Sequence, residues 1–259
     1  MKKNIFKKSL ATILCIVFLL TSAFSTYAYA TAADLSDPEF QRLIVEIMLN
    51  YENDPQATRD ELATLGIELL QEPSITHYTH NGNGIQTYGI NPTDYDLSVY
   101  AVSQKTATNV HILWSVNSNR SEWFSGPLDF ASIEYDSNVG SYKASDGDDA
   151  ITTVQGKNTG VVVFNVEDSK LSKGTYAYGS VNVTVPRGKR LHFGCRYVHT
   201  YTSFLVSGSA SYEFKPSTSV NFNGTGSLGL SYTMGMQVNV ATNTSKWERW
   251  LDNWVSIPT

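Results

Sequence analysis

The sequence predicts a mainly β protein, an antiparallel β-sandwich that forms either one domain or two β subdomains. A helical hairpin precedes the sandwich, and a short Trp-rich helix ends the chain. Three observations support this prediction. From about residue 96 onward, apolar and polar residues alternate with the period of two that is typical of strands. Turn-forming residues separate these segments at roughly ten-residue spacing without interleaved helices, which favours an antiparallel sandwich. Before residue 72, the apolar residues instead recur with a helical period.

Residues 1–30 have the three parts of an export signal. Lys2, Lys3, Lys7 and Lys8 form a positive start, and residues 10–20 are an apolar run too short to span a bilayer. The small residues Ala28 and Ala30 then provide a cleavage site after Ala30. We therefore expect a secreted, extracellular protein that begins at residue 31.

Residues 31–72 predict a helical hairpin, with one helix over 36–50 and a second over 55–71. Ser36 and Glu39 have capping-box spacing at the first start, and Asp54-Pro55 begins the second helix. The two apolar faces need a partner. The hairpin therefore either packs on the β domain or serves as a removable pro-segment. Residues 73–95 are rich in Gly, Asn and Pro and predict a linker.

Residues 96–186 predict a β-sandwich, and residues 187–259 predict a region of longer strands with a C-terminal helix. Val110, Ile112, Trp114 and Val116 show the alternation of the first region, with Trp114 as a core anchor. At the end of the chain, Ser245 and Glu248 have capping-box spacing. One side of the expected helix carries three tryptophans that either dock on the domain or form an aromatic binding surface: Trp247, Trp250 and Trp254.

The clearest alternation lies in residues 204–214 and 228–240. Each segment has one apolar face and one face of small, uncharged polar residues, and each is long enough for a membrane-crossing strand of about 9–11 residues. The pattern resembles the stem hairpins of β-pore-forming toxins, although an ordinary half-buried hairpin shows the same alternation. The candidate membrane-facing residues are Phe204, Val206, Tyr212, Leu228, Leu230, Tyr232, Met234, Met236 and Val238.

Few residues point to a metal or a reaction. Asp146, Asp148 and Asp149 surround Gly147 and could bind calcium, although they equally suit a solvated turn, and no other cofactor is implied. Four carboxylates are candidates for hydrolytic acid–base chemistry, and two histidine groupings are partial metal sets. The carboxylates are Glu122, Asp129, Glu134 and Asp136, and the partial sets are His77 with His80 and Cys195 with His199.

The charge balance limits the possible partners. Loss of four lysines with residues 1–30 changes the formal net charge from −5 to −9, which excludes a nucleic-acid partner and does not favour anionic lipid. The sequence therefore favours a secreted, non-enzymatic binding or interaction protein. The expected partner is an extracellular protein, a glycan or a membrane surface. The alternatives are a membrane-active protein that inserts residues 204–240, and a secreted hydrolase.

Overall fold

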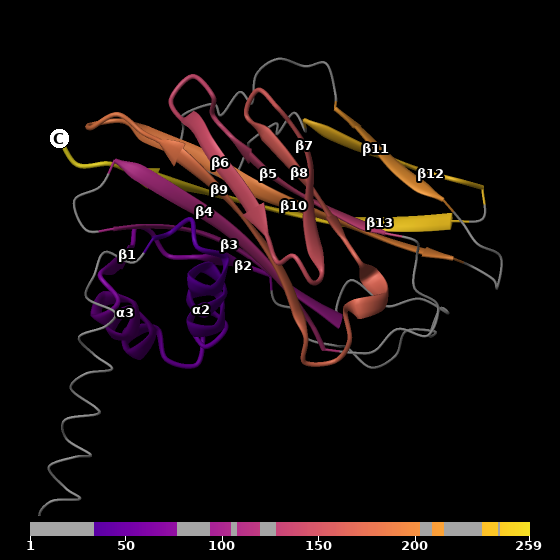
Figure 1. The fold of residues 1–259 in the computed structure, drawn as a ribbon, viewed down its shortest axis with the longest axis horizontal. Coiled ribbons are helices and arrows are strands. Elements are labelled where there is room, and N and C mark those ends of the chain that lie inside the picture. Colours follow the sequence, from indigo (N-terminus) through magenta and orange to yellow (C-terminus); the bar gives the residue numbers. More distant parts are fainter. Residues whose placement is uncertain are drawn as a thin grey trace, which may run out of the picture.

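The computed structural model describes residues 34–76, 94–104, 108–119, 128–202, 209–214, 235–242 and 244–259. Two antiparallel sheets pack face to face, and helices cover the outer side of one of them (Figure 1). The predicted fold class, a mainly β antiparallel sandwich preceded by a helical hairpin, is confirmed.

The first sheet has six strands, in the order β1-β3-β4-β9-β6, with β2 also paired to β3. Its strands are β1 (Ile67–Leu69), β2 (Ser74–Ile75), β3 (Tyr95–Gln104), β4 (Asn109–Ser118), β6 (Ser141–Gly147) and β9 (Tyr176–Thr184).

The second sheet has five strands, in the order β13-β10-β5-β8-β7. Its strands are β5 (Asp129–Tyr135), β7 (Thr152–Asn158), β8 (Val161–Val166), β10 (Arg190–Thr202) and β13 (Thr244–Ser256). A short 3-10 helix, η2 (Asp168–Lys170), follows β8. Residues on both sides of Pro186 thus share this sheet, and the ranges 96–186 and 187–259 build one sandwich.

The main core lies between the inner faces of the two sheets. Trp114 of β4 is fully buried there, with its ring centroid 5.7 Å from that of Phe164 of β8. Gly179 of β9 makes this packing possible, because a Cβ at that position would lie 2.7 Å from both Phe164 and Trp114. Trp114 is therefore the core anchor that the alternation predicts.

The helical hairpin covers the outer face of the six-stranded sheet (Figure 1). It consists of α2 (Pro38–Met48) and α3 (Pro55–Thr64), and each helix begins at an aspartate, Asp37 or Asp54, whose side chain accepts a backbone amide hydrogen bond. The second helix is shorter than the predicted 55–71. Gly66 adopts a φ of 75°, which terminates the helix, and the chain then joins the sheet edge as β1.

The predicted C-terminal helix is wrong. Thr244–Ser256 forms β13, which pairs along its whole length with β10 from Arg190↔Ser256 to Thr202↔Thr244. A complete backbone ladder to a strand of the same length outweighs the capping spacing of Ser245 and Glu248.

A separate two-stranded sheet lies over the outer face of the five-stranded sheet. It pairs β11 (Ala210–Phe214) with β12 (Met236–Val240), and we call this pair the folded-back hairpin. In the described part of the chain, no helix has the length and apolar character needed to cross a membrane.

Candidate functional site

The outer face of the five-stranded sheet carries the features that suit a binding or inserting surface. Alternate residues of each strand point to this face, because successive side chains of a strand lie on opposite sides. The folded-back hairpin covers the part of the face formed by Phe130, Val161, Val163 and Val198. The part near the far end of β10 and β13 carries two exposed tryptophans.

Trp250 and Trp254 of β13 are exposed by 44% and 37%, respectively. They are four residues apart on one face of the strand, which corresponds to about 13 Å at ~3.3 Å per residue. The guanidinium of Arg190 lies 4.3 Å from the ring centroid of Trp254, so this ring is held by a cation–π contact. Both rings are thus available to a partner while remaining attached to a paired strand.

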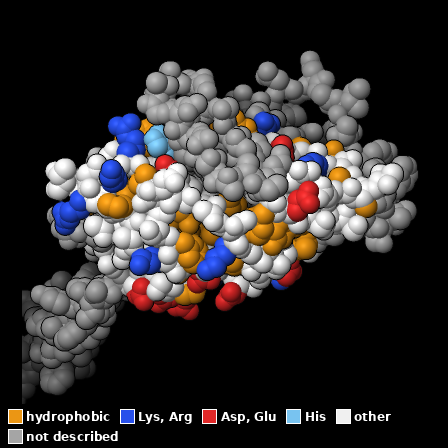
Figure 2. Space-filling model, turned by 90° about the horizontal axis from the view of Figure 1, so that it is seen from above, with side chains coloured by type: hydrophobic (Ala, Val, Ile, Leu, Met, Phe, Trp, Pro, Cys, Tyr) orange, Lys and Arg blue, Asp and Glu red, His pale blue; other side chains and the backbone are white. Residues whose placement is uncertain are grey.

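Side chains of both charge signs lie around the two rings. On β10, Arg196 lies opposite Trp250 and His192 lies opposite Trp254, while Asp252 lies between the tryptophans on β13. Burial and the charge of Arg190 lower the pKa of His192, so its imidazole is neutral at pH 7. Figure 2 shows this mixture more generally: on the face in view, side chains of both charges lie around the hydrophobic ones.

Trp247 does not belong to this surface. It packs against the main core, with its ring centroid 5.0 Å from that of His199 and 5.5 Å from that of Tyr95. The structure therefore separates the three predicted aromatic residues into one packing residue, Trp247, and two surface residues.

The folded-back hairpin presents its apolar side to the sheet. Met236 and Val238 are buried, and the half-buried Tyr212 lies on the same side, with its ring centroid 5.8 Å from that of Phe130. Gly156 of β7 leaves room for Tyr212, because a Cβ at that position would lie 2.6 Å from the tyrosine hydroxyl. Tyr212, Met236 and Val238 therefore have the predicted alternation, and here their apolar face meets protein.

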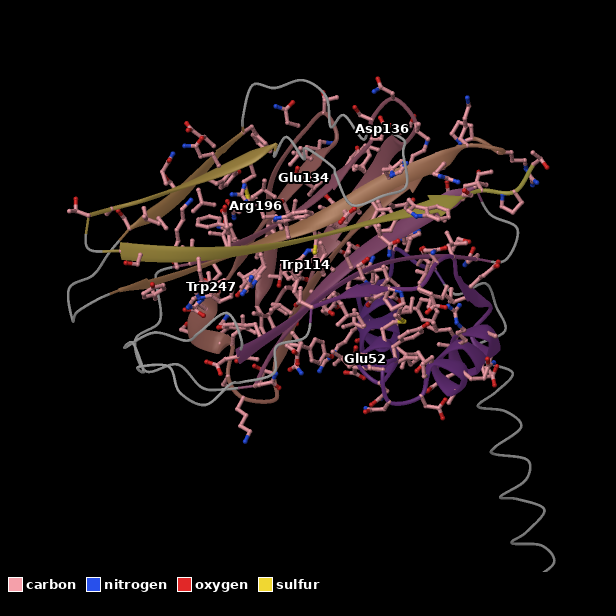
Figure 3. All side chains as sticks on the ribbon, turned by 180° about the vertical axis from the view of Figure 1, so that it is seen from behind. Glu52, Trp114, Glu134, Asp136, Arg196 and Trp247 are labelled. Atoms are coloured by element: carbon pink, nitrogen blue, oxygen red, sulfur yellow. The ribbon has the colours of Figure 1, made fainter. Side chains whose placement is uncertain are left out.

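Charged side chains of the sheet hold the backbone of the hairpin. Glu134 of β5 accepts a hydrogen bond from the amide of Gly235 at 3.0 Å, and Arg196 of β10 donates to the carbonyl of Met236 and also pairs with Glu248. Lys246 of β13 donates to the carbonyl of Val238 at 2.9 Å. Glu134 and Arg196, both labelled in Figure 3, are buried. Removing either one would leave a buried charge or peptide group without compensation.

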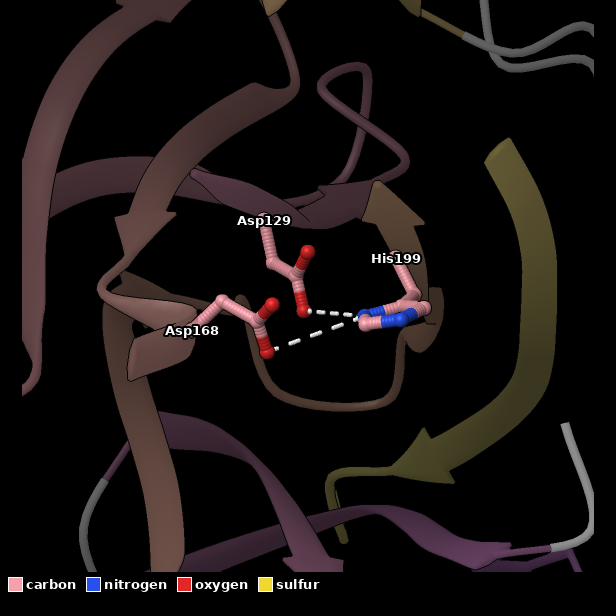
Figure 4. Close-up of side chains that lie close together, drawn as sticks. All are labelled: Asp129, Asp168 and His199. Atoms are coloured by element: carbon pink, nitrogen blue, oxygen red, sulfur yellow. Dashed lines mark hydrogen bonds and ion pairs between the residues drawn. The ribbon is translucent and has the colours of Figure 1, made fainter. Parts of the chain in front are cut away.

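A second cluster of buried ionisable groups lies inside the sandwich (Figure 4). Nδ1 of His199 lies 2.9 Å from Asp129 and 3.8 Å from Asp168, and all three residues are buried. Asp129 also accepts hydrogen bonds from the hydroxyl of Tyr197 and, at 2.8 Å, from the amide of Thr200.

In the described part of the chain, Asp129, Asp168 and His199 are the group whose ligand atoms are close enough to share a metal ion. However, both oxygens of Asp129 already accept protein hydrogen bonds. An ion would have to replace those bonds. The arrangement instead ties the end of β10 to β5 and to η2.

The acidic turn predicted to bind calcium is organised by its own backbone. Asp146 accepts from the amide of Gly147 at the end of β6, and Asp148 accepts from that of Ala150 in the turn that follows. Within the residues described, Asp146, Asp148 and Asp149 do not form a group that could share an ion. A calcium site there stays a prediction.

Other predicted residues do not come together. Asp129 and Glu134 are buried on opposite faces of β5, and Asp136 lies in the turn after that strand. They do not face each other across a cleft, so hydrolase chemistry gains no support from them. Cys195 is buried, and burial raises the pKa of its thiol, while His199 pairs with Asp129. Glu122, His77, His80, Phe204, Val206, Leu228, Leu230, Tyr232 and Met234 lie outside the described residues.

No family model and no curated protein matches the chain. Among solved structures, it is similar to the sixth cohesin of Acetivibrio cellulolyticus scaffoldin B, solved with a Cel5 dockerin, at 12% identity over 34% of this chain and 74% of that chain, with a TM-score of 0.27.

A cohesin of Clostridium thermocellum, OlpC in complex with Doc435, is similar at 12% identity over 37% of this chain and 75% of that one, with a TM-score of 0.28. The C-terminal domain of the Streptococcus pyogenes antigen I/II-family protein AspA is similar at 10% identity over 50% of this chain and 42% of that one, with a TM-score of 0.26.

Proposed function

We propose that this protein is a secreted, non-enzymatic binding protein that recognises another extracellular protein through the exposed face of β13. The observation that carries the proposal is the pair Trp250 and Trp254, exposed on one face of a strand that is paired along its whole length. Secretion rests on the predicted signal in residues 1–30.

Two features favour a protein partner over a glycan. The tryptophans lie among residues of both charges, Arg190, Arg196, Asp252 and Glu248, and Trp with Arg is the composition enriched at the energetic centres of protein interfaces. The contact between Arg190 and Trp254 also restricts one ring before binding, which lowers the ordering cost of association.

The test compares residues 31–259 of the wild type with the double variant Trp250→Ala/Trp254→Ala. Each of the two proteins is immobilised and used to capture proteins from the surface and medium of the producing cells. The affinity of each captured protein for the wild type and for the double variant is then measured. Tryptophans at the centre of an interface contribute about 2 kcal/mol or more, so we expect the affinity to fall by at least about 30-fold for each residue.

The matched control is Leu49→Ala/Val154→Ala. Both side chains are exposed by 38%. Leu49 directly follows α2 and Val154 lies on β7, both away from β13, so this variant should bind as the wild type does. Equal affinity of the tryptophan variant and the wild type would refute the proposal. If no protein is captured, and the tryptophan variant loses binding to a glycan that the wild type binds, the partner is a sugar and not a protein.

A further inference from the structure

We propose that α2 is an acid-sensitive cover: protonation of His111, which lies beneath the helical hairpin, makes α2 separate from the six-stranded sheet. This regulation goes beyond the proposed binding function, because Trp250 and Trp254 lie on the other sheet. It rests on the burial of His111, on the bonds that hold α2, and on the way α2 is connected to the sandwich.

His111 is buried on the face of β4 that meets the helical hairpin. Its side chain is 5% exposed, and it has the same parity on β4 as Leu113, which packs with the hairpin. Its neighbours on the adjacent strands are Val102 of β3 and Asn182 of β9. A positive charge on this imidazole would therefore lie between a sheet and a helix, where water compensates it poorly.

The groups around His111 give a protonated ring little support. Within the described residues, its buried Nδ1 has no hydrogen-bond partner, and neither has the buried side-chain oxygen of Asn182. Val102 and Asn182 carry no ionisable group, and the charge that acts on His111 from the hairpin is that of Asp34. Asp34 favours the protonated ring, but burial has the larger effect and lowers the pKa of His111 to about 4.

The bonds between α2 and the sheet are made by side chains. The hydroxyl of Tyr178 on β9 donates to the carbonyl of Pro38 at 3.1 Å, and the hydroxyl of Ser180 donates to the side-chain oxygen of Gln41 at 2.8 Å. Water can replace a hydroxyl donor at each of these positions when the helix moves. Neither bond belongs to a strand ladder, so α2 can separate without loss of strand pairing.

The connections of the two helices differ. α3 leads directly into β1, which pairs with β3 from Ile67↔Gln104 to Leu69↔Val102 and so fixes α3 to the sheet edge. α2 joins α3 through residues 49–54 and is itself part of no strand pair. Separation of α2 therefore leaves both sheets intact. It uncovers part of the apolar face formed by Tyr100, Leu113 and Tyr178.

The proton favours the open form of the protein. When α2 is separated, His111 meets water and has its ordinary pKa of about 6.5, whereas under the hairpin the pKa of His111 is about 4. The equilibrium constant for opening is therefore constant above pH 7 and rises as the pH falls below 6.5. At pH 5 these two pKa values increase it by about 30-fold. Acidification of the surroundings thus opens the cover.

Hydrogen exchange of residues 31–259, followed by mass spectrometry at about pH 7.5 and about pH 5, tests the proposal. Exchange rates are corrected for the intrinsic effect of pH on amide exchange. The amides of α2 should be less protected than those of β8, which lies in the other sheet, and their protection should fall by about 30-fold at the lower pH. Equal protection of α2 and β8 at both pH values would show that α2 opens only with the whole domain, which overturns the proposal.

The variant His111→Leu should abolish the fall in α2 protection, because leucine takes up no proton. Circular dichroism checks its fold, and His111→Gln provides the same test if the leucine variant does not fold. The matched control is Asp34→Asn, which removes the neighbouring charge. Hydrogen bonds from Ser36 lower the pKa of Asp34, so this carboxylate does not titrate between the two pH values, and the control should keep the fall. An equal fall in the folded His111 variant, or loss of the fall in Asp34→Asn, overturns the proposal.

Discussion

The contact between Gly235 and Val161 gives a direct measure of how closely the folded-back hairpin packs on the sheet. In the variant Gly235→Ala, the new Cβ would lie 2.2 Å from Cγ2 of Val161. Such a distance requires the hairpin or the valine to move. Overpacking of this kind costs about 1–3 kcal/mol, and we expect the free energy of unfolding to fall by that amount.

The companion variant Val161→Ala removes the two methyl groups that cause the clash. By itself it should destabilise the protein by about 1.6 kcal/mol, from two buried methyl groups at ~0.8 kcal/mol each, with an added cost for the cavity. In the double variant, the alanine at 235 occupies the vacated space. The double variant should therefore be more stable than the sum of the two single effects predicts, by at least about 1 kcal/mol.

The assay is urea unfolding followed by tryptophan fluorescence, together with hydrogen exchange of the amides of β11 and β12. Exchange should speed up in Gly235→Ala and return toward the wild-type rate in the double variant. If the two substitutions are additive in unfolding free energy, or if Gly235→Ala leaves hairpin exchange unchanged, the hairpin is not packed against β8 as described.

Three further predictions concern the sandwich. Burial lowers the pKa of His111 on β4 to about 4, so its imidazole is neutral in the fold and takes up a proton more readily in the unfolded chain. The free energy of unfolding is therefore not reduced by His111 above pH 6.5. As the pH falls from 6.5 toward 4, it decreases by roughly 3 kcal/mol in total, because the unfolded chain binds the proton first. His111→Leu should flatten urea-derived stability against pH in this window, and an unchanged slope would contradict the burial argument. Gly179→Ala should lower the free energy of unfolding by about 1–3 kcal/mol, because the new Cβ would lie 2.7 Å from Trp114 and Phe164. A urea midpoint equal to that of the wild type would exclude this overlap. Cys195 is buried with a raised pKa, so a thiol reagent should label residues 31–259 only after denaturation, and rapid labelling of the native protein would show that β10 is accessible.

The sequence predicted the sandwich because its strands are long and strictly alternating. Leu97, Val99 and Ala101, for example, all point into the main core, and the other parity of β3 meets the helices through Tyr100 and Val102. Both faces of this strand are covered. The start of the second helix was also predictable, because Asp54-Pro55 has a local capping mechanism that needs no distant partner. The predicted Ser36 cap of the first helix is wrong: Asp37 accepts the amide of Glu39 there, and Ser36 donates to Asp34 instead.

The C-terminal strand was misassigned because its tryptophans satisfy two periods. Trp247, Trp250, Leu251 and Trp254 fit one side of a helix, whereas in the strand Trp247 and Leu251 face inward and Trp250 and Trp254 face outward. Local spacing does not distinguish these cases. The free hydrogen-bonding edge of β10 decides between them, and that edge exists only in the folded sheet.

The charged anchors were not predictable as a set. Glu134, Arg196 and Gly235 are far apart in the chain and meet only because β12 is folded back over β5 and β10. The one local signal is a charged residue on the same face of a strand as a neighbouring apolar one, as for Arg196 beside Val198 on β10. This signal identifies a buried charge without naming its partner.

The pairing of the first and last parts of the described chain affects how the protein folds. β13 ends three residues before the last residue, and its carbonyl at Asp252 and side chain at Asn253 bond Ser74 and Glu72 near the start of the sandwich. The five-stranded sheet is therefore complete only when β13 is present. A chain cut before residue 244 lacks β13 and leaves one side of β10 as an unpaired edge that can template aggregation.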